Sequence, residues 1–71
     1  MFVGQLQLDK NERLQLAERD ISCGDVLEVL IADERDSSPR WIETRVEHNG
    51  ESYYLTGLQS YNPVGLFARM K

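Results

Sequence analysis

The sequence predicts a small all-β protein, and three observations support this. Apolar and polar residues alternate over short stretches, which is the period-two pattern of strands. Turn-forming residues interrupt these stretches roughly every eight to twelve positions, a spacing typical of small sandwiches and barrels. The dipeptide Asn49-Gly50 lies between two such stretches and indicates a hairpin. We therefore expect one SH3-like β-barrel domain over residues 1–71, with about six short antiparallel strands.

The first half of the chain is expected to supply three strands. Residues 2–8 include two leucines that alternate with glutamines, and a turn begins at Asp9. Residues 12–19 have two interpretations: alternating leucines favour a strand, whereas helix-forming composition and Asn11 as an N-cap favour a helix. We prefer the strand, because the stretch is short and lacks apolar residues at helical spacing. Residues 25–31 are rich in branched apolar side chains, as is typical of a central strand.

The second half is expected to supply a hairpin and a final strand. Residues 33–39 are polar and charged, which is typical of a solvated loop. Residues 41–57 read as two strands around the Asn-Gly turn. Residues 59–63 end with a proline, which cannot donate to a strand ladder, and residues 64–70 form the last predicted strand.

A two-residue loop at Asn49-Gly50 would determine which side chains of the hairpin share a face. Counting outward, the pairs on one face are His48–Glu51, Val46–Tyr53, Thr44–Leu55 and Ile42–Gly57. Those on the other face are Glu47–Ser52, Arg45–Tyr54, Glu43–Thr56 and Trp41–Leu58. We expect the first face to join the core through Ile42, Val46, Tyr53 and Leu55. The second face interleaves charges with two aromatic rings.

The second face of the hairpin has a structural and a functional interpretation. In the structural one, Arg45 stacks on Tyr54 and Trp41 covers one end of the barrel. In the functional one, Trp41, Arg45 and Tyr54 form a patch that contacts a partner, with Arg40 beside it. Tryptophan, tyrosine and arginine are the residue types enriched at binding hot spots. These four residues are the candidate binding residues.

The charge distribution favours a protein partner or a small ligand over a nucleic acid or a membrane. Residues 1–36 hold nine acidic and four basic residues, whereas residues 37–71 hold three acidic and four basic ones. The chain as a whole has a net charge of −4 and no cluster of lysine or arginine. Because phosphate backbones are bound mainly through such clusters, the sequence lacks the electrostatic signature of a nucleic-acid-binding protein.

The cysteine count and the N-terminus predict the compartment. A single cysteine excludes an internal disulfide and suits a reducing environment. The N-terminus has no basic region followed by an apolar stretch, and no segment is long and apolar enough to cross a membrane. We therefore expect a cytoplasmic protein without membrane contact.

Motifs of catalysis and metal binding are missing from the sequence. Cys23 and His48 are the only residues of their types, and a nucleophilic pair between them would require the fold to bring them together. A metal site would need Cys23, Asp25, Glu47 and His48 to converge, and their spacing matches no common ligand pattern. We expect no enzymatic activity, no cofactor and no bound metal.

Glu28 is an unusual residue, because it lies within the apolar stretch 25–31. A carboxylate in such a strand is expected at a rim of the barrel or paired with an arginine from a neighbouring strand. Arg45 is the candidate partner.

Several of these elements resemble a family of small bacterial proteins classed as a domain of unknown function. The matching elements, within about residues 4–69, are Cys23-Gly-Asp-Val-Leu-Glu-Val, Trp41-Ile-Glu-Thr-Arg-Val-Glu-His-Asn-Gly, Tyr53-Tyr-Leu-Thr-Gly-Leu and Gly65-Leu-Phe-Ala-Arg. The chain departs from the family at Arg13-Leu14, where relatives tend to have an aromatic residue after the arginine, and in its longer loop at 33–39. The resemblance implies a compact β domain from Firmicutes, often in mobile-element regions, and no known activity.

Three functional hypotheses follow. The leading one is a non-enzymatic adaptor that binds a protein. The second is a nucleic-acid accessory module that uses Trp41, Tyr54, Arg40 and Arg45 for stacking on single-stranded bases. The third, prompted by the mobile-element setting, is an acidic inhibitor of a nucleic-acid enzyme, with Asp33, Glu34 and Asp36 imitating phosphates. Both a monomer and a homodimer joined through residues 64–70 remain open.

Overall fold

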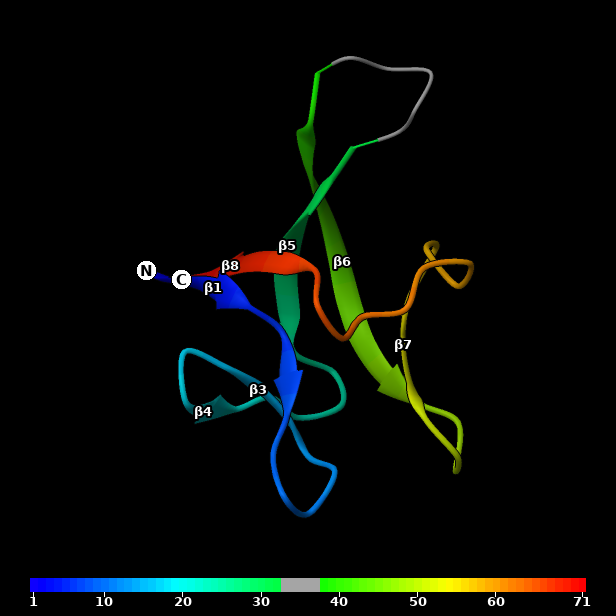
Figure 1. Cartoon of the computed structure of the whole chain (residues 1–71). Coiled ribbons are helices and arrows are strands. Elements are labelled where there is room, and N and C mark those ends of the chain that lie inside the picture. The colour runs from blue at the N-terminus through cyan, green and yellow to red at the C-terminus, as the bar shows by residue number, and fades with distance from the viewer. Residues whose placement is uncertain (33–37) are drawn as a thin grey trace.

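A computed structural model describes residues 1–32 and 38–71, over which it contains eight strands and no helix (Figure 1). The strands are β1 (Phe2–Gln5), β2 (Gln7–Leu8), β3 (Leu14–Leu16), β4 (Arg19–Asp20), β5 (Val26–Ile31), β6 (Arg40–His48), β7 (Tyr53–Leu55) and β8 (Phe67–Met70). The predicted all-β class is confirmed for this part of the chain. No helix there is long and apolar enough to span a membrane.

The described strands form two antiparallel sheets and no closed barrel. Five strands follow the order β1-β8-β5-β6-β7, and three follow the order β2-β3-β4. The chain passes between the sheets at Leu6, whose N–H donates to the carbonyl of Leu66 at 2.8 Å and whose carbonyl accepts from the N–H of Gly65 at 2.7 Å. Leu6 interrupts the expected strand over residues 2–8, and β1 and β7 lie at opposite edges of the larger sheet. The expected closure therefore does not occur.

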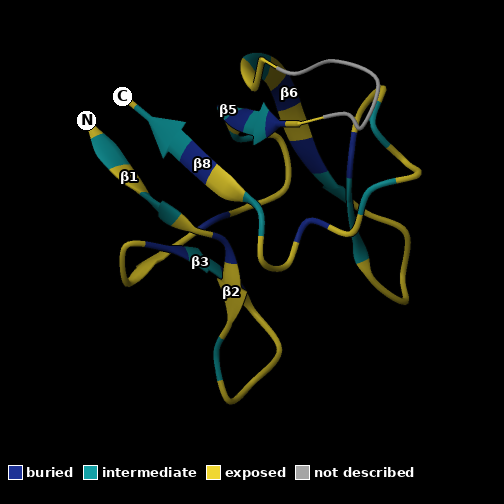
Figure 2. Ribbon diagram, turned by 45° about the horizontal axis from the view of Figure 1, so that its top comes forward, coloured by how far each residue is buried: buried dark blue, intermediate teal, exposed yellow. Residues whose placement is uncertain are grey.

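The core lies between the two sheets (Figure 2). Its buried members are Leu6, Leu14, Leu16, Ile21, Leu27, Val29, Ile31, Val46, Leu55 and Ala68. Along β5, every second residue belongs to this core, which is the alternation expected of a strand with one covered face. The predicted core face of the hairpin is confirmed, because Val46 and Leu55 are fully buried and Ile42 and Tyr53 pack against the core.

The predicted register of the hairpin is wrong by two residues. Val46 lies opposite Leu55 and His48 lies opposite Tyr53, so four residues rather than two connect β6 to β7. The side chain of Asn49 explains the longer turn, because its Oδ1 accepts hydrogen bonds from the N–H groups of Glu51 and Ser52, each at 2.9 Å. A shift of two residues leaves every side chain on its predicted face, whereas a shift of one would have reversed them all.

The two-residue hairpin turn of this fold lies instead at Ala17-Glu18, between β3 and β4. Leu16 pairs with Arg19, and the two turn residues have φ angles of 51° and 65°. Positive φ at both central residues is the requirement of a type I′ turn, although neither residue is Asn or Gly. The strand interpretation of residues 12–19 is thus confirmed at Leu14–Leu16, and the helix alternative is wrong.

Replacing Glu18 with glycine is expected to stabilise the protein. A non-glycine residue in the left-handed conformation destabilises the folded state by about 1–2 kcal/mol. Glycine removes this strain, but its greater conformational freedom in the unfolded state offsets about 0.5–1 kcal/mol of the gain. We expect the free energy of unfolding in urea to rise by about 0.5–1 kcal/mol. Glu51→Gly is the matched control, because Glu51 is also an exposed turn residue but has no positive φ. Equal destabilisation by both substitutions would contradict the prediction.

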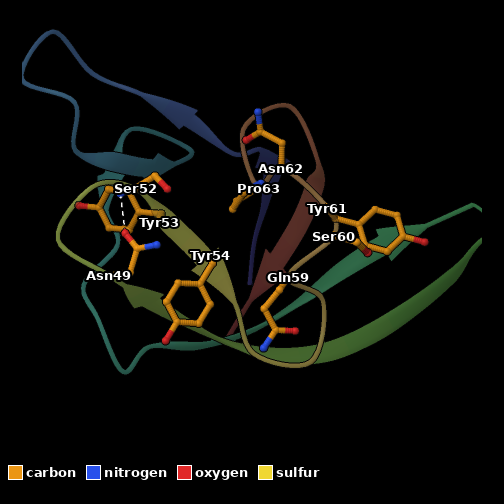
Figure 3. Close-up of a pocket in the computed structure, with 9 residues that line it drawn as sticks. All are labelled: Asn49, Ser52, Tyr53, Tyr54, Gln59, Ser60, Tyr61, Asn62 and Pro63. Atoms are coloured by element: carbon orange, nitrogen blue, oxygen red, sulfur yellow. Dashed lines mark hydrogen bonds between the residues drawn. The ribbon is translucent and has the colours of Figure 1, made fainter.

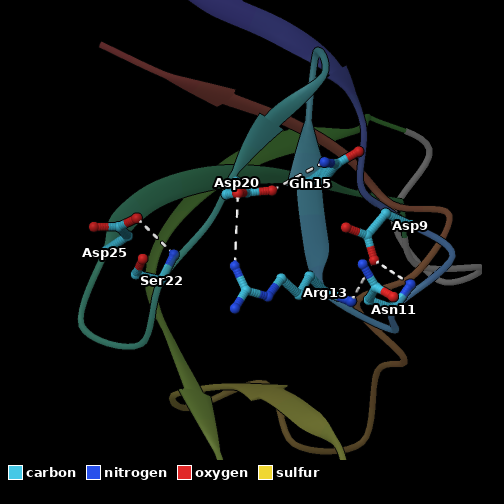
Figure 4. A network of polar contacts seen from close by, with 7 residues as sticks. All are labelled: Asp9, Asn11, Arg13, Gln15, Asp20, Ser22 and Asp25. Atoms are coloured by element: carbon cyan, nitrogen blue, oxygen red, sulfur yellow. Dashed lines mark hydrogen bonds and ion pairs between the residues drawn. The ribbon is translucent and has the colours of Figure 1, made fainter.

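Side-chain carboxylates hold the turns of the first half of the chain (Figure 4). Asp9 Oδ1 accepts from the N–H groups of Asn11 at 2.7 Å and Arg13 at 2.9 Å, which confirms the predicted turn. Asp20 Oδ1 accepts from Gln15 Nε2 at 2.9 Å across the β3–β4 hairpin. Asp25 likewise accepts from the N–H of Ser22 at 2.9 Å, so three acidic residues in the described part of the first half hold local turns or hairpins.

Candidate functional site

One face of the five-stranded sheet packs on the core, and the other, which we call the outer face, is open. Val3, Arg69, Glu28 and Glu43 lie side by side across four strands of the outer face. Strand alternation places the remaining members two residues away along each strand. The outer face comprises Val3, Gln5, Val26, Glu28, Leu30, Trp41, Glu43, Arg45, Phe67 and Arg69.

The centre of the outer face is a stack of Trp41, Arg69 and Glu28. The guanidinium carbon of Arg69 lies 4.2 Å from the centroid of the Trp41 ring. The same guanidinium donates to Glu28, from Nε at 3.0 Å and from Nη2 at 3.4 Å. A cation over an indole ring is attracted by the negative face of the ring, so this group holds the ring and the carboxylate in place.

Glu28 therefore pairs with an arginine from a neighbouring strand, as expected, but the predicted partner Arg45 is wrong. β8 lies next to β5, and the sheet register puts Arg69 directly opposite Glu28. Arg45 lies opposite Val26, and its Nε is 3.2 Å from Oε1 of Glu47 on its own strand.

Large apolar side chains surround this stack and are exposed. Val3 is 54% exposed, Val26 49% and Phe67 50%. They come from three different strands, β1, β5 and β8, so they are spread over the face. Exposed apolar side chains around an aromatic–arginine centre are typical of a protein-contact surface.

The four candidate binding residues do not form one patch. Trp41, Arg45 and Tyr54 project from the same side of the β6–β7 hairpin, since Tyr54 pairs with Glu47. Trp41 is six residues from Glu47 along β6, which corresponds to about 20 Å. Arg45 lies opposite Thr56, and the N–H of Thr56 donates to the carbonyl of Arg45. In the described chain, no cation–π contact joins Arg45 to the ring of Tyr54. Arg40 pairs with Ile31, so it projects from the opposite side of the sheet to Trp41.

Tyr54 instead lines a groove at the other edge of the sheet (Figure 3). The groove has a volume of about 620 Å³ and is lined by Asn49 and Ser52, by Tyr53 and Tyr54 of β7, and by residues 59–63. Tyr54 and Gln59 point to the same side, whereas Tyr61 points away from Tyr54 (Figure 3). We call it the tyrosine groove. Gln59 and Tyr61 were not among the sequence-based candidates, although a run without charge from 52 to 68 marks the segment.

Cys23 and His48 take separate positions. Cys23 is free and exposed. His48 Nδ1 accepts from the N–H of Gly50 at 3.0 Å. The imidazole ring lies edge-on to the Tyr53 ring, with 4.8 Å between the two ring centroids. No hydrogen bond joins Cys23 to His48, and the described residues hold no group of three or more His, Cys, Asp or Glu arranged for a metal ion. Asp33, Glu34 and Asp36, the candidate phosphate mimics, lie outside the described residues.

The fold and its surfaces define a small two-sheet β protein with an open aromatic and apolar sheet face and a tyrosine-lined groove. The family model for a domain of unknown function, DUF5348, matches residues 4–70, and the chain belongs to that family. This agrees with the unknown-function family expected from the sequence motifs. Comparisons with curated proteins and with solved structures found no match.

Proposed function

We propose that the chain is a non-enzymatic protein-binding module of the cytoplasm that contacts its partner through the outer face. One observation supports this most directly: Val3, Val26 and Phe67 are half exposed on a single sheet face around the Trp41–Arg69 stack. Burying such side chains against a partner would stabilise the complex by about 25 cal/mol for each Å² of apolar surface removed from water. SH3-like barrels, small β folds that serve as adaptors, are the nearest architectural analogy, and the analogy does not itself establish function.

The charges of the outer face support a protein partner over a nucleic acid. Its two arginines are both engaged, Arg69 with Glu28 and Arg45 with Glu47. Each of these guanidinium groups would have to break its ion pair with glutamate before it could contact a phosphate. Phosphate contacts supply most of the affinity of non-specific nucleic-acid binding. The net charge of −4 adds long-range repulsion.

Affinity capture from cells tests the proposal. The intact protein is compared with Phe67→Ser, Val3→Ser and the control Val64→Ser, which changes a comparably exposed valine (41%) outside the outer face. We expect each outer-face substitution to reduce recovery of the main captured protein about tenfold, as for a central contact residue, and Val64→Ser to leave recovery unchanged. Circular dichroism and urea unfolding would check that each variant folds. Equal capture by all variants, or captured material that nuclease removes, would reject the proposal in favour of another surface or a nucleic acid.

A further inference from the structure

The tyrosine groove is distinct from the outer face in its composition. None of its nine lining residues is charged, although 28% of the chain is Asp, Glu, Lys or Arg. A phosphate or carboxylate ligand requires cationic side chains, and a basic ligand requires anionic ones. The groove therefore suits an uncharged ligand.

The groove also presents polar groups that have no hydrogen-bond partner among residues 1–32 and 38–71. The hydroxyls of Tyr53, Tyr54 and Tyr61 and the amide of Gln59 make no hydrogen bond to any described residue. Each of these groups contains an O–H or N–H donor. Aromatic rings that carry donors at their tips suit a ligand with apolar surface and repeated carbonyl acceptors.

The walls of the groove are held in place by hydrogen bonds of the surrounding turns. Asn49 Oδ1 accepts from the N–H groups of Glu51 and Ser52, and Asn62 Oδ1 accepts from the N–H of Val64 at 3.0 Å. The N–H of Tyr61 donates to the carbonyl of Leu58 at 3.0 Å, and Pro63 is buried beneath the loop. A rigid wall loses little entropy when a ligand binds, which matters for an open site on a small domain.

We propose that the tyrosine groove binds an uncharged proline-rich segment of another protein in the polyproline II conformation. A polyproline II chain makes no internal hydrogen bonds, so its carbonyls are free to accept from tyrosine hydroxyls and side-chain amides. Its proline rings pack flat against aromatic side chains, and its stiffness lowers the entropic cost of binding. This groove lies at the β7 edge and shares no residue with the outer face, although Tyr54 projects from the same side of the sheet, so the site goes beyond the function proposed for that face.

The test is titration of the intact protein with a fluorescein-labelled polyproline peptide. A glycine–serine peptide of equal length, a neutral cello-oligosaccharide and single-stranded oligothymidylate are the competing probes. We expect polyproline to bind with a dissociation constant at or below about 1 mM and the other probes not to compete. Backbone amide shifts should concentrate in residues 49–63.

Variants of the groove make the test specific. Tyr54 is not among the side chains packed on the core, so Tyr54→Ala removes a wall of the groove without opening the core. We expect Tyr54→Ala to weaken polyproline binding about tenfold and Tyr61→Phe, which removes only a hydroxyl, about threefold. Phe67→Ser should bind polyproline normally while losing capture through the outer face, so the two proposals fail independently. Absence of polyproline binding, equal binding by Tyr54→Ala, or preference for the oligosaccharide or oligothymidylate would overturn the proposal.

Discussion

Leu6→Ala is expected to lower the free energy of unfolding by about 2–5 kcal/mol, the usual cost of a leucine truncated inside a core. Leu6 has no exposed surface and lies where the chain passes from the larger sheet to the smaller one. A cavity at this point would remove contacts from both sheets at once. A domain of this length has only about 4–11 kcal/mol of stability, so a large fraction of the molecules should unfold under mild denaturant.

Leu8→Ala is the matched control for that experiment. Leu8 is the same residue type two positions later, and its side chain is 43% exposed. Urea unfolding followed by circular dichroism should show a loss below about 1 kcal/mol for Leu8→Ala. A similar loss for both substitutions would mean that Leu6 is not the junction of the two sheets.

Arg69→Ala is expected to cost about 1–2 kcal/mol, because it removes a cation–π contact and an ion pair in one step. The arginine and glutamate side chains are 31% and 39% exposed, so solvent screening keeps the value well below that of a buried pair. Trp41 is the only tryptophan, so its fluorescence can be followed directly. The emission should shift to longer wavelength, because removing the Arg69 guanidinium exposes the indole ring to water. A double-mutant cycle with Glu28→Ala should give a coupling of about 0.5–1 kcal/mol.

Arg45→Ala is the control for Arg69→Ala. Arg45 also has one ion pair, with Glu47, but its side chain is 56% exposed and contacts no aromatic ring in the described chain. We expect a change in stability within about 0.5 kcal/mol and no shift of Trp41 fluorescence. If Arg45→Ala matched Arg69→Ala in both measurements, the stack would not be the centre of the outer face.

Local patterning was sufficient to predict most of the strands and the inward side of the hairpin. The alternation around Leu14–Leu16 reflects the pleat of a strand with one covered face, so it can be read without knowing the neighbours. Residues 25–31 were predicted as a strand from their branched apolar side chains, but they are apolar on both faces except at Glu28, so the sequence did not show which face is covered. The hairpin faces were likewise predictable, because an error of two residues in register leaves them unchanged. The actual register was not, since it depends on which N–H groups the Asn49 side chain accepts from.

The sequence by itself determined the all-β class, the core face of the hairpin and the uncharged run from 52 to 68. Only the tertiary structure decided the partners. It placed β8 between β1 and β5, so that Arg69 rather than Arg45 meets Glu28, and it separated Trp41 from Tyr54. The physical reason is that side-chain alternation is a property of one strand, whereas strand order depends on contacts between residues far apart in the chain, such as Glu28 and Arg69.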